Sequence, residues 1–180
     1  MNIRKTYCAA GLTAVILMSG CEGKIPFSAA KTPELTPSWT AQAEIKFGDN
    51  AANAEVTRIE PGCWKFGFTE PQELCGVTMT LENGALTASL GELTVTAGEG
   101  ENTILPQLIA AGIDAAAESS AGAAEKDGVL TIKTEADGSS CTVTADSATG
   151  EILSFRSPAN KLAVYFSDVS PYTEEVGVIE

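Results

Sequence analysis

The chain has 180 residues, of which 11 are Lys or Arg and 24 are Asp or Glu, so its formal net charge is −13. So acidic a surface repels the phosphates of nucleic acid, which excludes DNA or RNA as a partner. The sequence contains no histidine. It therefore lacks the imidazole base on which Ser–His and Cys–His nucleophilic catalysis depend.

Residues 1–20 have the features of an export signal. Two basic residues, Arg4 and Lys5, precede an apolar run at 7–18, and small residues then lead to Cys21. A helix that crosses a bilayer needs about 20 apolar residues, so this run is too short to be a permanent anchor. The segment predicts export followed by cleavage.

Met18-Ser-Gly-Cys21 resembles the lipobox of bacterial lipoproteins, in which an apolar residue and two small residues precede the lipid-bearing cysteine. The resemblance implies that Cys21 becomes the N-terminus and carries a diacylglyceryl group. This group would hold the protein on the outer face of the cytoplasmic membrane, in the cell envelope. The Pro-bearing segment that follows, to residue 37, is typical of a flexible linker. An ordinary secretory signal with a cysteine at its cleavage site is the alternative.

From Trp39 onward the pattern is that of short strands. Apolar and polar residues alternate over 39–47, and two further strands are predicted at 54–60 and 63–69. Strands 76–82 and 85–90 flank Asn83-Gly84, a pair that accepts the positive φ values of a type I′ turn. Residues 93–96 are expected to continue the second of these strands after a bulge at Gly91.

The pattern then changes to helical spacing. Beyond an acidic loop at 98–102, apolar residues recur along one stripe over 104–118, with Thr103 as the N-cap. Residues 119–122 are expected to be flexible. The four remaining strands are predicted at 129–135, 140–146, 151–156 and 161–167.

These elements predict a mostly β (α+β) fold. An antiparallel meander of nine or ten strands forms an open half-barrel, and one amphipathic helix lies across its concave face. The expected organisation is a signal peptide at 1–20, lipidated Cys21 with its linker at 21–37, a half-barrel domain at 38–170 and an acidic tail at 171–180.

The order of elements resembles the half-barrel carriers that ferry lipoproteins across the periplasm. It is also similar to their lipid-anchored relatives, the outer-membrane acceptor and the mycobacterial glycolipid-carrying lipoproteins. Trp64-Lys-Phe-Gly-Phe-Thr-Glu-Pro71 followed by Leu74 is similar to the point where a strand of these proteins runs into Pro-x-x-Leu. A linker here replaces the helix that precedes the first strand of the soluble carriers, which resembles a small lipid-anchored protein of Gram-positive type.

The resemblance implies a monomeric, non-enzymatic module that binds a hydrophobic ligand, either a lipid or acyl chain or an acylated peptide. Alternation does not distinguish an open apolar face from a packed one, so a dry core explains the same residues. In that case the protein is an interaction or sensory lipoprotein whose acidic exterior docks a basic partner. The candidate ligand-binding residues are Trp64, Phe66, Phe68, Val77, Met79, Leu81, Leu86, Leu105, Leu108, Ile109 and Ile113.

No catalytic residue, metal site or cofactor is expected. The sequence contains no Gly-x-Ser-x-Gly motif, and the loop at 98–102 lacks the Asp-x-Asp-x-Asp-Gly spacing of a calcium loop. Removal of the signal and acylation of Cys21 leave Cys63, Cys75 and Cys141. Three cysteines allow at most one disulfide, and the sequence does not select the pair.

Overall fold

The computed structural model describes residues 35–97, 105–119 and 123–174. In these residues it contains eleven strands, one α-helix and one short 3₁₀ helix. The elements are β1 (Trp39–Phe47), β2 (Asn50–Glu60), β3 (Cys63–Glu70), β4 (Thr78–Glu82), β5 (Ala85–Leu90), β6 (Leu93–Ala97), α1 (Leu105–Glu118), β7 (Ala123–Lys126), β8 (Val129–Ala136), β9 (Ser139–Asp146), β10 (Ile152–Ser157), η2 (Pro158–Asn160) and β11 (Leu162–Pro171).

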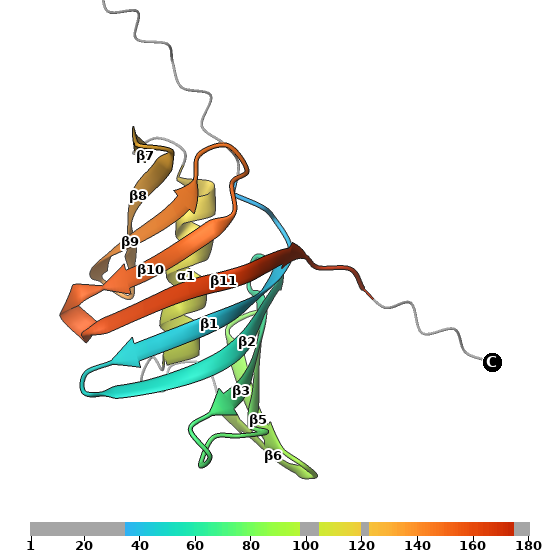
Figure 1. The fold of residues 1–180 in the computed structure, drawn as a ribbon. Helices are drawn as coiled ribbons and strands as arrows, with labels where there is room; N and C mark the ends of the chain where they lie inside the picture. Colours follow the sequence, from blue (N-terminus) through green and yellow to red (C-terminus); the bar gives the residue numbers. More distant parts are fainter. Residues whose placement is uncertain (1–34, 98–104, 120–122, 175–180) are drawn as a thin grey trace, which may run out of the picture. The chain divides into compact units, whose positions relative to one another are not determined.

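The strands form one antiparallel sheet in the order β6-β5-β4-β3-β2-β1-β11-β10-β9-β8-β7. Strands consecutive in sequence are neighbours, except that β1 pairs with β11 and α1 separates β6 from β7. Because β6 and β7 are the two edges of the sheet, α1 crosses one face on its way between them, and the sheet curves around it (Figure 1). The predicted open half-barrel with one helix on its concave face is confirmed.

Asx-Gly turns connect three of the hairpins. Asn83 and Gly84 have φ values of 50° and 88°, as a type I′ turn requires. Both residues of Asp127–Gly128 and of Asp137–Gly138 likewise have positive φ. These turns connect β4 to β5, β7 to β8 and β8 to β9.

Two expectations about the strands were wrong. Residues 93–96 do not continue the preceding strand, because Gly91 and Glu92 form a two-residue turn and Leu93 pairs with Leu90 on the returning strand. Gly91 has a φ of 59°, which suits the first turn position of a type II′ hairpin, so this glycine reverses the chain. Strand β7 was not predicted either, because its alanines have low β propensity and its pairing with β8 comes from the tertiary structure.

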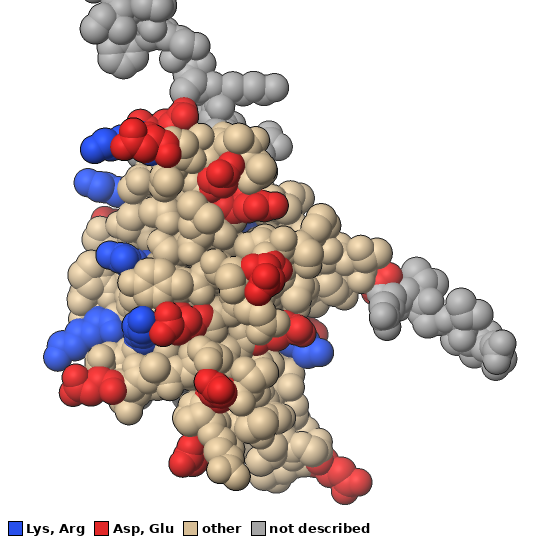
Figure 2. Space-filling model, viewed as in Figure 1, with Lys and Arg blue, Asp and Glu red and all other residues tan. Residues whose placement is uncertain are grey.

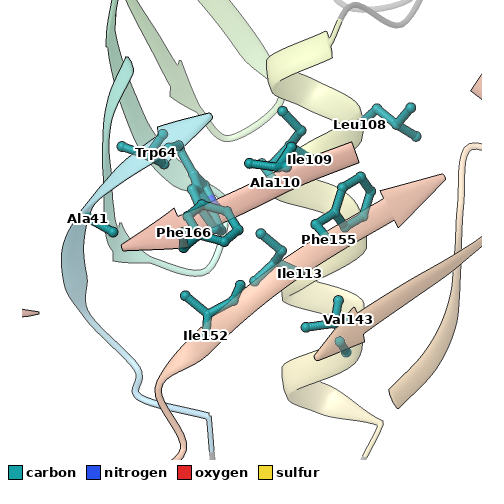
Figure 3. Packing of buried hydrophobic residues seen from close by; sticks show 14 of the residues in the cluster. Ala41, Trp64, Leu108, Ile109, Ala110, Ile113, Val143, Ile152, Phe155 and Phe166 are labelled. Carbon is teal, nitrogen blue, oxygen red and sulfur yellow. The ribbon is translucent and has the colours of Figure 1, made fainter. Parts of the chain in front are cut away.

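The inner face of the sheet carries an aromatic core. Trp39 and Trp64 are at most 2% exposed, and their rings meet edge to face at 5.5 Å between centroids. Trp39 also meets Phe166 edge to face at 5.4 Å. Figure 3 shows Trp64 and Phe166 together with Ile109 and Ile113, which project from α1 toward the strands. The predicted stripe of α1 therefore faces this core.

The helix lies closest to the C-terminal half of the sheet. It packs mainly on β8 and β9, with fewer contacts to β10 and β4. At Gly112 a Cβ atom would lie 2.3 Å from Cε2 of Phe155 on β10, so only glycine permits this approach. Among the described residues, no helix is long and apolar enough to cross a membrane.

Candidate apolar ligand site

The carboxylate of Asp114 fastens α1 to the β2–β3 hairpin. Nε of Arg58 donates a hydrogen bond to Oδ1 of Asp114 at 2.8 Å, and the Gly62 N–H and Trp64 Nε1–H each donate to Oδ2 at 2.9 Å. Arg58 also donates to the carbonyl of Pro37, and its guanidinium lies 5.8 Å from the centre of the Trp64 ring. Arg58 is 3% exposed, so this is a buried ion pair with its polar groups satisfied.

The space beside this ion pair is filled. Leu35, Trp39, Arg58, Ile113 and Ile152 close around a gap that leaves no room for a ligand. Leu35 falls within the expected linker but packs into the core. Under the C-terminal half of α1, the interior is therefore a packed core.

Beneath the N-terminal end of α1, the interior is hollow. A cavity of ≈ 250 Å³ lies between the first turn of the helix and strands β1, β3 and β4, and the described residues of its wall expose no polar surface. The space is partly open to solvent. The lining residues are Ile45, Phe47, Phe66, Phe68, Leu74, Met79, Leu105, Pro106 and Ile109.

The loop between β3 and β4 completes the cavity wall and is held by backbone hydrogen bonds. The Leu74 N–H donates to the Pro71 carbonyl at 2.9 Å, and the Val77 N–H donates to the Leu74 carbonyl at 2.9 Å. The loop is tied to β3 because Phe68 N–H donates to Val77 O at 2.9 Å and Gly76 N–H donates to Phe68 O at 3.0 Å. The Pro-x-x-Leu segment therefore brings the side chain of Leu74 into the site.

An exposed apolar strip lies on the same face of the sheet, toward the β6 edge. It consists of Leu90, Leu93 and Val95, which are 51%, 67% and 61% exposed. Val95 pairs with Ala88, which in turn pairs with Met79 of the cavity wall. Cross-strand partners project from the same face, so the strip extends the apolar surface of the cavity.

The structure divides the eleven residues predicted for the site. Val77 is half-buried in the loop before β4 and does not line the cavity. Those that line the cavity are Phe66, Phe68, Met79, Leu105 and Ile109. Those buried in the core outside it are Trp64, Leu81, Leu86, Leu108 and Ile113.

Four residues of the lining were not predicted from the sequence: Ile45, Phe47, Leu74 and Pro106. Ile45 and Phe47 alternate with polar residues on β1, but only the order of strands in the sheet brings them toward β3. The turn signal at Pro71 marked the loop, whereas the inward direction of Leu74 follows from the loop's hydrogen bonds.

The three cysteines of the domain are unpaired in the structure. Cys75 is exposed, Cys63 is half-buried and Cys141 is buried. Burial and the neighbouring carboxylate of Glu60, 3.5 Å away, raise the pKa of the Cys63 thiol. No group of three or more potential metal-binding side chains occurs in the described ranges. Cys21, Thr103 and the loop at 98–102 lie outside them.

A larger hollow of ≈ 610 Å³ lies on the opposite face of the sheet and is wide open. Its wall includes the polar side chains of Glu44, Asn53 and Glu70, and Asn53 donates a hydrogen bond to Glu70 at 2.6 Å. A hydrocarbon chain bound here would cover these polar groups without offering them a hydrogen bond. On this face acidic side chains are scattered over the strands and form no single patch (Figure 2).

No family model and no curated protein matches the chain. Solved structures do match it. An uncharacterised conserved protein from Thermus thermophilus is 12% identical, with a TM-score of 0.48 over 78% of this chain and 82% of that one. A LolA superfamily protein from Nitrosomonas europaea is 11% identical, with a TM-score of 0.42 over 81% and 90% of the two chains.

A domain from Vibrio parahaemolyticus described as a putative outer membrane lipoprotein-sorting protein is also similar. It is 11% identical, with a TM-score of 0.42 over 78% of this chain and 88% of that domain. The descriptions of these two neighbours, a LolA superfamily protein and a lipoprotein-sorting domain, agree with the resemblance stated for the order of elements. This likeness concerns the fold alone, so the function of the site is argued from its residues.

Proposed function

We propose that this chain is a non-enzymatic binding module that holds a hydrophobic ligand, such as a lipid or acyl chain, on the concave face of its sheet. The apolar cavity beneath the first turn of α1 supports this proposal. A hydrocarbon chain has no hydrogen-bonding groups, so a wall without polar surface accepts it and leaves no buried polar group unpaired.

The size of the cavity indicates how such a ligand would lie. Pockets that enclose a whole ligand measure roughly 300–1,000 Å³, and this one measures ≈ 250 Å³. It would therefore take one end of a hydrocarbon chain. The rest of the chain would follow the exposed strip of Leu90, Leu93 and Val95 toward the β6 edge and cover apolar surface that now meets water.

The chemistry of the site supports binding without catalysis. The described residues of the cavity wall carry no carboxylate, hydroxyl, thiol or amine, and the sequence contains no histidine. A bound acyl group would therefore meet neither a nucleophile nor a general base.

Anchoring is the second part of the proposal. The lipobox-like Met18-Ser-Gly-Cys21 supports a diacylglyceryl group on Cys21, which would hold the module at the outer face of the cytoplasmic membrane. The native protein should incorporate a labelled fatty acid at its N-terminal cysteine, and Cys21→Ser should lose the label. Equal labelling of the two proteins, or none in the native protein, would contradict the anchor and leave the binding proposal unaffected.

The binding proposal is tested by placing a charge inside the cavity. Met79→Glu puts a carboxylate against the apolar wall, whereas Thr80→Glu puts the same group one residue along β4 on the other face. We expect Met79→Glu to weaken uptake of a fluorescent fatty acid at least tenfold, because an unpaired buried charge costs several kcal/mol. Thr80→Glu should stay within about twofold of the native protein.

A second variant fills the cavity without adding a charge. Leu74→Trp enlarges a side chain that the loop already directs inward, and Gln72→Trp at an exposed position of the same loop is its control. Circular dichroism of each variant establishes that the fold is intact. Absence of lipid in organic extracts of native protein, together with no fatty-acid uptake, would overturn the proposal and favour an interaction module instead.

A further inference from the structure

Strand β6 lacks the features that protect the edge of a sheet. Its sequence is Leu-Thr-Val-Thr-Ala, with no charge and no proline, and its pairing with β5 is regular throughout. No described strand lies beyond it. The opposite edge strand, β7, is protected, since two of its four residues are the charged Glu125 and Lys126.

The turn before β6 determines which backbone groups face outward. Leu90 and Leu93 flank a two-residue turn and form a hydrogen-bonded pair. Hydrogen-bonded and non-hydrogen-bonded pairs alternate along an antiparallel ladder. The N–H and C=O groups of Thr94 and Thr96 therefore point away from β5, toward the free edge.

We propose that β6 pairs with β6 of a second copy of this chain, antiparallel and centred on Val95. In this arrangement Val95 lies opposite its own copy, and Thr94 exchanges two hydrogen bonds with Thr96 of the second copy. Leu93 lies opposite Ala97, so all apolar side chains stay on the concave face and the threonines stay on the other. Thr96 already has a threonine neighbour across the ladder, since its hydroxyl lies 3.2 Å from that of Thr87.

Charge favours a second copy at this edge. The net charge of −13 makes most of the surface repel another copy. Neither β5 nor β6 contains a charged residue, so pairing here places no carboxylates opposite each other. The pairing also shields Val95, which is 61% exposed in one copy.

The length of β6 limits the strength of this contact. Five paired residues bury less than the roughly 1,000 Å² that a stable protein interface needs. The dimer should therefore be reversible and depend on concentration, whereas the resemblance described above implies a monomer. A covalent trap detects such a contact directly.

Cross-linking through an introduced cysteine at Val95 is the test. In the full chain, with every native cysteine except the buried Cys141 replaced by serine, the Cα atoms of two Val95→Cys copies should lie about 4.5 Å apart, within disulfide reach. Leu93→Cys is the matched control on the same face, and it is slightly more exposed. In the proposed register Leu93 lies opposite Ala97 of the second copy. The two introduced cysteines at position 93 would therefore be offset by four residues along the strands, about 13 Å. Mild oxidation should cross-link Val95→Cys at least tenfold faster.

A proline removes half of the proposed hydrogen bonds without disturbing the β5–β6 hairpin. Thr96→Pro deletes an outward N–H, and such a position tolerates proline in an edge strand. Added to Val95→Cys, it should reduce cross-linking at least tenfold, while Glu125→Pro at the β7 edge should have no effect. Equal cross-linking of Val95→Cys and Leu93→Cys, or cross-linking that Thr96→Pro does not change, would overturn the proposal.

Discussion

The two halves of the concave face carry the same alternating pattern but bury it to different degrees. Under α1, Leu130, Val143 and Phe155 of β8, β9 and β10 are at most 3% exposed. On β6, Leu93 and Val95 project from the same face of the sheet and are more than 60% exposed. The helix packs mainly on β8 and β9 and leaves the β6 edge of the other half uncovered. Burial here is thus decided by the position of one helix, and the uncovered half provides the surface that we assign to a ligand and to a second copy.

The largest effect is expected where the helix is fastened to the open half. Arg58→Ala leaves the carboxylate of Asp114 without its buried cation and should lower the free energy of unfolding by about 3–5 kcal/mol. Denaturant titration measures the loss. The control is Lys46→Ala, which breaks the ion pair of Lys46 with Glu44; both side chains are about half exposed. This pair should contribute about 0–1 kcal/mol, and an equal loss in the two variants would show that the Arg58 contact does not hold the helix.

The same substitution in each half tests the comparison directly. Leu130→Ala on β8 removes a side chain that is 3% exposed and should cost about 2–5 kcal/mol through lost contacts and the space left behind. Leu93→Ala on β6 removes one that is 67% exposed and should change stability by no more than about 0.5 kcal/mol. Thermal unfolding of both variants measures the difference. Similar losses would mean that the β6 strip is covered in solution.

A smaller effect is expected where the helix approaches the sheet most closely. Gly112→Ala places a methyl group 2.3 Å from the ring of Phe155 and should destabilise the protein by about 1–3 kcal/mol. In a Phe155→Leu background the clash is relieved. The same substitution should then stabilise the helix by up to about 1 kcal/mol, because alanine favours helix over glycine. A loss in both backgrounds would contradict this close approach.

The fold was predictable because its signals are local. Asn83-Gly84 and Asp137-Gly138 mark hairpins by the backbone conformation that their residues accept, and the structure has positive φ at all four positions. The amphipathic stripe from Leu105 to Ala116 identified the helix and the face that it buries. The β7 strand carries no such local signal, and its pairing is established only once β8 is in place.

The division of the inner face into core and cavity could not be predicted. Phe66 and Trp64 alternate identically on β3, yet one lines the cavity and the other packs within the core.

A usable signal was overlooked for the ion pair. Arg58 lies two and four residues after Val56 and Ala54 on β2, so its side chain points to the same inner face. Asp114 is the only charged residue of α1 before its last position. An inward arginine and a lone acid in an apolar helix each require a partner.

The smallest expected effect concerns a turn of the covered half. The backbone N–H groups of Thr149 and Ala148 donate to Oδ1 of Asp146 at 2.8 and 2.9 Å and lower the pKa of this carboxyl. Because this pKa is lower in the folded state, ionised Asp146 stabilises the fold at pH values above the ordinary aspartate pKa of 3.8. This contribution is lost as the pH falls through the folded pKa. Asp146→Asn should therefore lower the melting temperature at pH 6, and its difference from the native protein should shrink below pH 4. Glu55→Gln, at an exposed position of β2, is the control; a deficit of Asp146→Asn that stays constant between pH 6 and pH 3 would show that the charge of Asp146 does not stabilise the turn.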